Sequence, residues 1–140
     1  MKHELFQPDA ELLDALVAEP SASLLRSFFR SRVTRAETPF IYDECFTFGL
    51  FDDLTDDLSP SAAFSLLASA PDIASTESAS ARFACALALV ASLAQHSDTT
   101  EEPSRLHQVW PDFAARVAAL SPTHDAVHQF HQIKNWHRIQ

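Results

Sequence analysis

The residues with the spacing closest to a metal site are three histidines near the C-terminus. They are His124, His128 and His131, separated by four and three residues. A helix would place all three imidazoles on one face, and three histidines can hold zinc with its fourth position open. The apolar residues Phe130 and Ile133 fall on the opposite face, and no carboxylate joins the histidines at helical spacing. We therefore expect a solvated polar face, with no metal and no cofactor.

Two pairs of adjacent aspartates, Asp52–Asp53 and Asp56–Asp57, are the next candidates for chemistry. Acid–base catalysis needs carboxyl groups whose environments push their pKa values apart. These four aspartates have similar neighbours and share one predicted solvent-facing side, so nothing separates an acid from a base. A triad assembled from residues distant in the sequence stays open. The sequence indicates no catalytic residues and predicts that the protein is not an enzyme.

The two cysteines, Cys45 and Cys85, form no C-x-x-C pair and no disulfide framework. Cys45 follows Asp43 and Glu44, whose charges have the wrong sign to lower a thiol pKa. Cys85 lies in an apolar helical segment, where a thiol behaves as a small hydrophobic group. We expect reduced thiols in a cytoplasmic protein, although a single bridge between the two remains open.

The composition predicts an all-α fold. Among 140 residues there is one glycine, Gly49, whereas alanine, leucine and serine are abundant. Hairpin turns, phosphate loops and nucleophile elbows need glycine where the backbone takes a positive φ or approaches a ligand closely. We expect residues 1–140 to form one domain, a bundle of about six or seven helices. Helix pairs joined by short turns are also compatible with an irregular α-solenoid.

Prolines and serines predict the helix boundaries. The expected helices cover about residues 8–19, 21–37, 42–58, 59–70, 78–96, 99–120 and 121–140. Ser59–Pro60 and Ser121–Pro122 have the sequence of a helix start, with serine as the N-cap and proline in the first turn. Thr99 and Glu102 have the spacing of a capping box, and Pro111 should kink or divide the helix that they begin.

Apolar spacing predicts which helix faces are buried. The first helix has a stripe of Leu12, Leu13, Leu16 and Val17, and the second has Leu24, Leu25, Phe28, Phe29 and Val33. The helix over 78–96 is apolar on nearly all sides, so we expect Phe83–Ala94 to be the most buried segment. Between Tyr42 and Leu58 the pattern is amphipathic. Its apolar side holds Phe46, Leu50, Phe51, Leu54 and Leu58, and its acidic side holds the two aspartate pairs.

Charge is distributed very unevenly along the chain. No lysine or arginine lies between Arg35 and Arg82, and this gap contains nine acids. The remaining residues carry ten acids and ten bases, so the whole formal net charge of −9 belongs to residues 36–81. A localised negative field favours a basic partner and opposes nucleic-acid phosphates. The arginines between Arg26 and Arg35 form the one basic concentration, and we expect them to pair with acids of the same chain.

Aromatic residues are interleaved with these acids, at Phe40, Tyr42, Phe48 and Phe51. Aromatic anchors inside a charged rim are typical of protein-binding surfaces. The predicted partner-binding residues are Tyr42, Asp43, Glu44, Phe48, Asp52, Asp53, Asp56 and Asp57. The alternative is that this segment is the solvated outer face of a surface helix and contacts no partner.

Neither a signal peptide nor a membrane span is expected. Residues 1–13 contain one lysine and three acids and lack the apolar run of a signal peptide. The longest uncharged stretch near the middle, Phe83–Ser97, is too short to cross a bilayer. The expected location is the cytoplasm, without membrane association.

The stretch Ala86-Leu-Ala-Leu-Val-Ala-Ser-Leu-Ala-Gln-His-Ser-Asp-Thr-Thr-Glu-Glu-Pro103 resembles helix-pair segments of small bacterial immunity proteins from toxin–immunity systems. The resemblance implies a cytoplasmic inhibitor that covers the active site of a cognate toxin or effector. The basic surface would belong to that toxin or effector. Two other classes remain open. A non-catalytic helical adaptor or scaffold would use the same acidic surface, and an enzyme would require a polar pocket. The sequence makes no prediction of oligomeric state.

Overall fold

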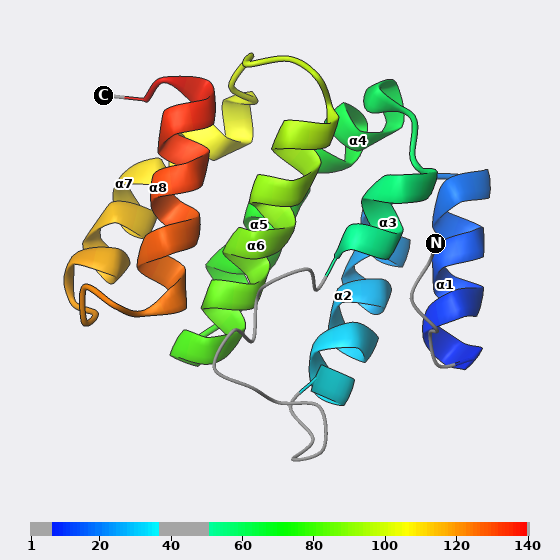
Figure 1. The fold of residues 1–140 in the computed structure, drawn as a ribbon, viewed down its shortest axis with the longest axis horizontal. Helices are drawn as coiled ribbons and strands as arrows, with labels where there is room; N and C mark the ends of the chain where they lie inside the picture. Colours follow the sequence, from blue (N-terminus) through cyan, green and yellow to red (C-terminus); the bar gives the residue numbers. More distant parts are fainter. Residues whose placement is uncertain (1–6, 37–50, 140) are drawn as a thin grey trace.

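A computed structural model shows how the chain folds (Figure 1). It describes residues 7–36 and 51–139, apart from the side chains of Gln7, Pro8, Arg35, Ala36, Asp52, Asp53 and Thr55. Within these residues there are eight helices and no strand, so the all-α expectation is confirmed. The helices are α1 (Gln7–Ala18), α2 (Ala22–Ala36), α3 (Asp52–Asp57), α4 (Pro60–Leu67), α5 (Ala70–Thr76), α6 (Ser80–His96), α7 (Ser104–Ala118) and α8 (Asp125–His137).

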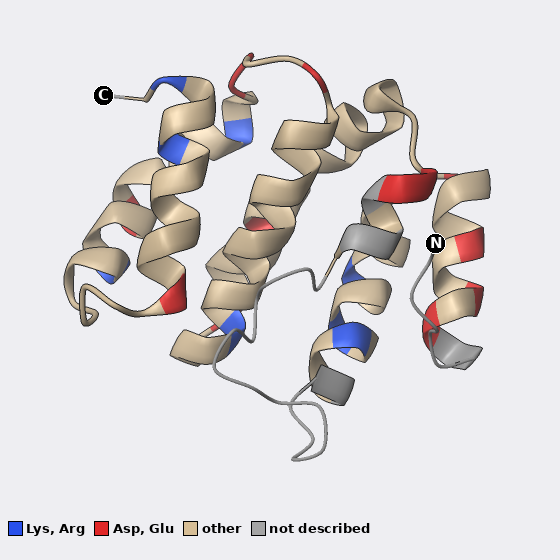
Figure 2. Ribbon diagram, in the orientation of Figure 1, with Lys and Arg blue, Asp and Glu red and all other residues tan. Residues whose placement is uncertain are grey.

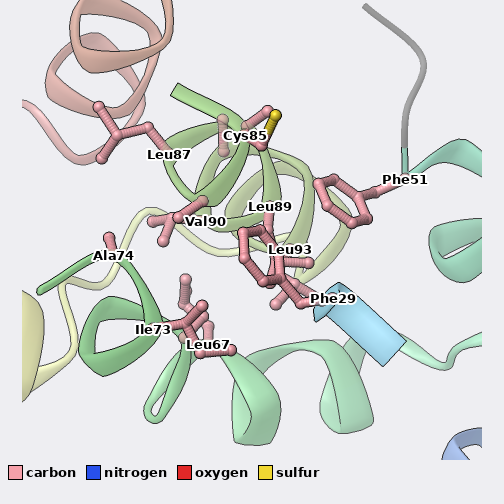
Figure 3. Packing of buried hydrophobic residues seen from close by; sticks show 14 of the residues in the cluster. Phe29, Phe51, Leu67, Ile73, Ala74, Cys85, Leu87, Leu89, Val90 and Leu93 are labelled. Carbon is pink, nitrogen blue, oxygen red and sulfur yellow. The ribbon is translucent and has the colours of Figure 1, made fainter. Parts of the chain in front are cut away.

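Helix α6 forms the centre of the fold. In Figure 1 it runs between the α7–α8 pair on one side and α3 and α4 on the other. All residues from Phe83 to Ala94 are buried except Ser92, which confirms the expected most buried segment. Its alanines let neighbouring helices approach closely, while leucines fill the space between them. Figure 3 shows Leu89 and Leu93 pointing toward Phe29, and Val90 pointing toward Ile73.

Serine side chains cap the starts of two helices, α2 and α4. The Ser21 hydroxyl accepts the Leu24 N–H at 3.1 Å and begins α2. The Ser59 hydroxyl accepts the Ala62 N–H at 3.1 Å, and Pro60 occupies the first turn of α4. Each hydroxyl satisfies an N–H group that has no partner inside its own helix.

Helix α5 is not among the expected helices, because the sequence pattern predicts that one helix ends at residue 70 and the next begins at residue 78. Pro71 lies instead in the first turn of α5, where the absence of an N–H group removes no helical hydrogen bond. The segment 59–77 therefore forms two short helices, α4 and α5, both packed on α6. This division explains why eight helices replace the expected six or seven.

The predicted starts of the last two helices were wrong. Helix α7 begins at Ser104, and the Thr99 hydroxyl accepts the Glu101 N–H at 3.2 Å within the preceding loop. Helix α8 begins at Asp125, because His124 Nδ1 accepts the Ala126 N–H at 3.0 Å and serves as the N-cap. The capping spacing at residue 99 and the Ser121–Pro122 signature were both local patterns that tertiary structure overrode.

Two further expectations about single residues need correction. Of the two outcomes expected at Pro111, a kink or a division, the division does not occur, because the helix continues through this exposed residue to Ala118. Val17 was placed in the apolar stripe of α1 but is 38% exposed, whereas Leu13 and Leu16 are buried. The apolar stripe of α1 is narrower than the sequence pattern indicated.

Stacked aromatic rings join helices that are distant in the sequence. The Trp110 and Phe130 rings connect α7 to α8, with centroids 4.3 Å apart and planes 11° from parallel. Phe83 of α6 meets Phe113 of α7 edge to face at 5.6 Å. Such pairs add about 0.5–1.5 kcal/mol to the gain from burial alone. None of the described helices is long and apolar enough to cross a membrane.

Candidate partner-binding surface

The structure describes part of the predicted partner-binding surface. Tyr42, Asp43, Glu44 and Phe48 lie outside the described residues. The backbone of Asp52 and Asp53 forms the start of α3, but their side chains are also outside the description. Asp56 is exposed and Asp57 is half-buried.

The apolar side of α3 was predicted correctly within the described residues. Phe51, Leu54 and Leu58 are buried, at intervals of three and four residues. This spacing turns one side of the helix toward the core and leaves Asp56 on the solvent side. The segregation of acids from apolar residues, inferred from the sequence, is therefore present in the last turn of α3.

Phe51 cannot serve as an aromatic anchor for a partner. Its ring stacks on Phe29 of α2 at 5.9 Å, with the planes 18° apart, and lies 6.4 Å from the Phe28 ring. Only 1% of the residue is exposed. Figure 3 shows the ring turned toward α6 and away from solvent. Phe51 instead fixes α3 to the rest of the protein.

A histidine from α6 holds the end of α3. His96 Nε2 donates to the Leu58 carbonyl at 2.5 Å, directly after the last residue of α3. Asp56 and Asp57 occupy the last turn of this helix, where carboxylates oppose the partial negative charge of the helix end. An imidazole N–H at the same end offsets part of that repulsion. His96 therefore positions the acidic helix, a role that no local sequence pattern indicates.

Asp72 is one of the nine acids in the base-free segment, and an arginine compensates its charge. The Arg105 Nε donates to Asp72 Oδ1 at 2.5 Å, joining α7 to α5. Both side chains are 44% exposed, so the pair contributes little to stability. Its consequence for function is that Asp72 adds little to an external negative field.

Glu77 also faces an arginine of α7. The charge of Glu77 raises the pKa of Arg116, although desolvation by burial has the larger effect and lowers that pKa overall. The Arg116 guanidinium lies 3.7 Å from the centre of the Phe83 ring and donates to the Ala74 carbonyl at 3.3 Å. The guanidinium thus remains charged and compensates Glu77.

The nine acids of residues 36–81 therefore fall into two groups. Two of the nine acids, Asp72 and Glu77, face arginines of α7, and the other seven fall between Glu37 and Asp57. Asp72 and Glu77 therefore contribute less to an external negative field than the sequence count indicates.

Helix α1 carries acids that sequence reasoning missed. Residues 3–25 contain five acids and no lysine or arginine, but the arginines of α2 cancelled them in the overall count. Glu11, Asp14 and Glu19 are exposed, whereas Asp9 is buried and its carboxylate accepts a hydrogen bond from the Ser31 hydroxyl. Figure 2 shows acidic residues on α1 and at the end of α3 on the same side of the molecule.

Two arginines of α2 differ in their surroundings. Arg26 donates to the Thr76 hydroxyl at 3.3 Å, so it is turned toward α5. Arg30 is exposed. In Figure 2 the basic residues of α2 are visible below α3, separate from the acidic end of that helix.

The three C-terminal histidines have individual structural contacts. His124 caps α8, and His128 Nε2 accepts from the Gln132 amide at 2.9 Å. His131 is exposed and meets the ring of its neighbour Phe130 edge to face at 5.7 Å. Across the described ranges 7–36 and 51–139, no three histidine, cysteine, aspartate or glutamate side chains are grouped to hold a metal ion.

Comparisons with protein-family models, with curated proteins and with solved structures give no match to this chain.

Proposed function

We propose that this protein is a cytoplasmic immunity protein that binds a cognate toxin or effector through an acidic surface and neutralises it. The observation that carries the proposal is the distribution of charge along the chain. Arginines of α7 face Asp72 and Glu77, and the other seven acids of residues 36–81 lie between Glu37 and Asp57, a segment that contains no lysine or arginine. This charge favours a partner with a basic surface.

The support from geometry concerns how α3 is held. Phe51 and Leu54 fix the apolar side of the helix in the core, and His96 binds the carbonyl that follows its last turn. A helix held at both ends keeps the exposed Asp56 in place when a partner approaches, so less ordering entropy is lost on binding. The resemblance of Ala86–Pro103 to immunity proteins belongs to the proposal as well, since it falls on α6 and the loop after it, which support the surface.

The proposed mechanism is occlusion assisted by electrostatic steering. A toxin that acts on a polyanionic substrate needs a basic cleft, and an array of carboxylates can occupy such a cleft. Long-range attraction accelerates the encounter, and apolar anchors then slow dissociation. With Phe51 in the core, the anchors offered by the sequence are Tyr42 and Phe48.

The test begins with capture of the partner from the native host and its identification. The activity of the purified partner is then measured with and without the protein at matched concentrations. Stoichiometric inhibition of a toxic enzyme is the expected result. A partner with no toxic activity would overturn the immunity role, and a basic protein bound without inhibition would favour the helical adaptor instead.

A variant separates inhibition by the acidic surface from inhibition elsewhere. Reversal of Asp52, Asp53, Asp56 and Asp57 to lysine should abolish protection while the melting curve shows a folded protein. If the folded variant inhibits as well as the unmodified protein, the acidic surface is not the binding surface.

A further inference from the structure

A second candidate site lies where the C-terminal end of α6 meets the second half of α8. The surface there is hollowed into a depression of about 320 Å³, open to solvent. Its lining consists of Gln95, Gln132, Asn135 and Trp136. This volume is at the lower end of the range of roughly 300–1,000 Å³ for small-molecule sites.

The lining carries no formal charge, in a protein whose net charge is −9. It combines three carboxamides with one indole. Each carboxamide offers a donor and an acceptor side by side, and the indole offers a flat apolar face. Such a surface suits a neutral ligand that has both hydroxyl or amide groups and an apolar face.

Hydrogen bonds order two of the three carboxamides, those of Gln95 and Gln132, before any ligand arrives. Gln95 Nε2 donates to Gln132 Oε1 at 3.5 Å, and Gln132 Nε2 donates to His128 Nε2 at 2.9 Å. The second bond fixes which end of the Gln132 amide is the acceptor in the first. Polar groups that are already oriented lose less entropy when they bind a ligand.

Trp136 is held in place by the loop between α6 and α7. Its indole Nε1 donates to the Thr99 carbonyl at 2.8 Å, and His137 Nδ1 is 3.0 Å from the Thr100 carbonyl, a hydrogen bond to the same loop. The indole N–H is therefore used within the protein. What the half-buried ring presents to the depression is its apolar surface.

We propose that this depression binds the ring of a neutral pyranoside sugar. A pyranose ring is compact and presents an apolar C–H face, which can lie on the Trp136 indole. Its rim hydroxyls both donate and accept, and so match the amides of Gln132 and Asn135. An extended peptide is less well suited, because it requires a groove that follows its backbone over several residues. The site is independent of the acidic surface and of the proposed immunity role.

Affinity should be weak, with a Kd on the order of 1–10 mM, because an open depression leaves much of the ligand in water. The probes are the methyl glycosides of glucose, galactose and mannose, titrated into the full protein labelled with ¹⁵N. The two indole N–H signals serve as reporters, since Trp136 lines the depression while Trp110 is buried against Phe130. We expect at least one glycoside to shift the Trp136 signal saturably without shifting that of Trp110.

Variants test whether the depression is the site. Asn135→Ala should weaken binding roughly threefold to tenfold through loss of hydrogen bonds to the ligand. Gln108→Ala is the control, because Gln108 is an exposed amide on α7 outside the depression and its loss should leave the titration unchanged. N-acetylglycine N-methylamide, a neutral peptide analogue, should bind more weakly than the best glycoside.

Three results would overturn the proposal. The first is a Trp136 signal that no glycoside shifts at millimolar concentration. The second is equal or tighter binding of the peptide analogue, which would assign the depression to peptides. The third is an Asn135→Ala titration indistinguishable from that of Gln108→Ala.

Discussion

At the scale of single residues, Phe51 and His96 determine how the acidic helix is presented. Phe51 precedes α3 and anchors it on the Phe28 and Phe29 rings of α2. His96, the last residue of α6, binds the Leu58 carbonyl at the other end of α3. A helix of six residues is too short to be stable alone, so these two contacts decide its orientation.

Phe51→Ala should lower the free energy of unfolding by about 3–5 kcal/mol, because it removes a fully buried ring and leaves a cavity. Urea unfolding measures the loss. Asp56→Ala is the matched control on the exposed side of the same helix, with an expected change within about 0.5 kcal/mol. A Phe51→Ala loss below 1 kcal/mol, on the order of a surface substitution, would mean that the ring is not packed as described.

His96→Ala should cost about 0.5–1.5 kcal/mol through loss of the hydrogen bond to the Leu58 carbonyl. The local effect should exceed the global one, so amide protons of α3 and the start of α4 should exchange faster with solvent. Hydrogen-exchange NMR makes the comparison, with Gln95→Ala as the neighbouring control. Equal exchange rates in the two variants would exclude a positioning role for His96.

At the scale of elements, α7 contains the clearest conflict between local sequence and fold. Pro111 lies in its interior and has no N–H to donate to the His107 carbonyl four residues earlier. Leu106, Val109, Trp110, Phe113 and Val117 are nevertheless buried along one face. Burial of this face holds the helix together across the proline.

Pro111→Ala should therefore stabilise the protein by about 1–3 kcal/mol, since it restores a helical hydrogen bond at an exposed position. Part of the gain is lost because alanine leaves the unfolded chain more flexible. Thermal unfolding gives the answer, with the exposed neighbour Asp112→Ala as control. A lower melting temperature for Pro111→Ala would show that proline stabilises the folded protein at this position more than alanine does.

The elements that the sequence predicted well are those with strong local patterns. Ser59 with Pro60 defines the start of α4, and the apolar run after Ala81 defines α6. The starts of α7 and α8 were missed because Pro103 and His124 take the cap positions, neither of which is a common N-cap residue. Helix α5 was missed because Pro71 suits a helix start as well as a break.

The sign of the charge at the candidate site was predictable from the sequence, but the set of acids that contribute to it was not. The periodicity correctly predicted that Phe51, Leu54 and Leu58 face the core and that Asp56 faces solvent. The pairing of Asp72 with Arg105 joins residues 33 positions apart, so no local pattern could indicate it. The acids of α1 were missed for another reason, since the arginines of α2 cancel their charge in the sequence count.

At the scale of the whole molecule, residues 82–140 and residues 37–57 differ in their charge. Residues 82–140 carry five acids and five bases, and their arginines on α7 also face acids of α5 and the segment after it. Residues 37–57 contain seven acids and no lysine or arginine. The electric field of these acids acts over roughly 8 Å at physiological salt, and over longer distances when the salt concentration is lowered.

The most direct test of the acidic binding surface is the rate constant for association with the captured partner, measured at low and high salt. The variant is Asp56→Lys with Asp57→Lys, and the control is Glu101→Lys with Asp112→Lys, both exposed and outside α3. Each pair changes the net charge equally. We predict that the α3 pair slows association roughly tenfold or more at low salt, with little effect from the control and a smaller difference at high salt. Equal rates for the two folded variants would contradict the account, because they would show that net charge matters and its position on α3 does not.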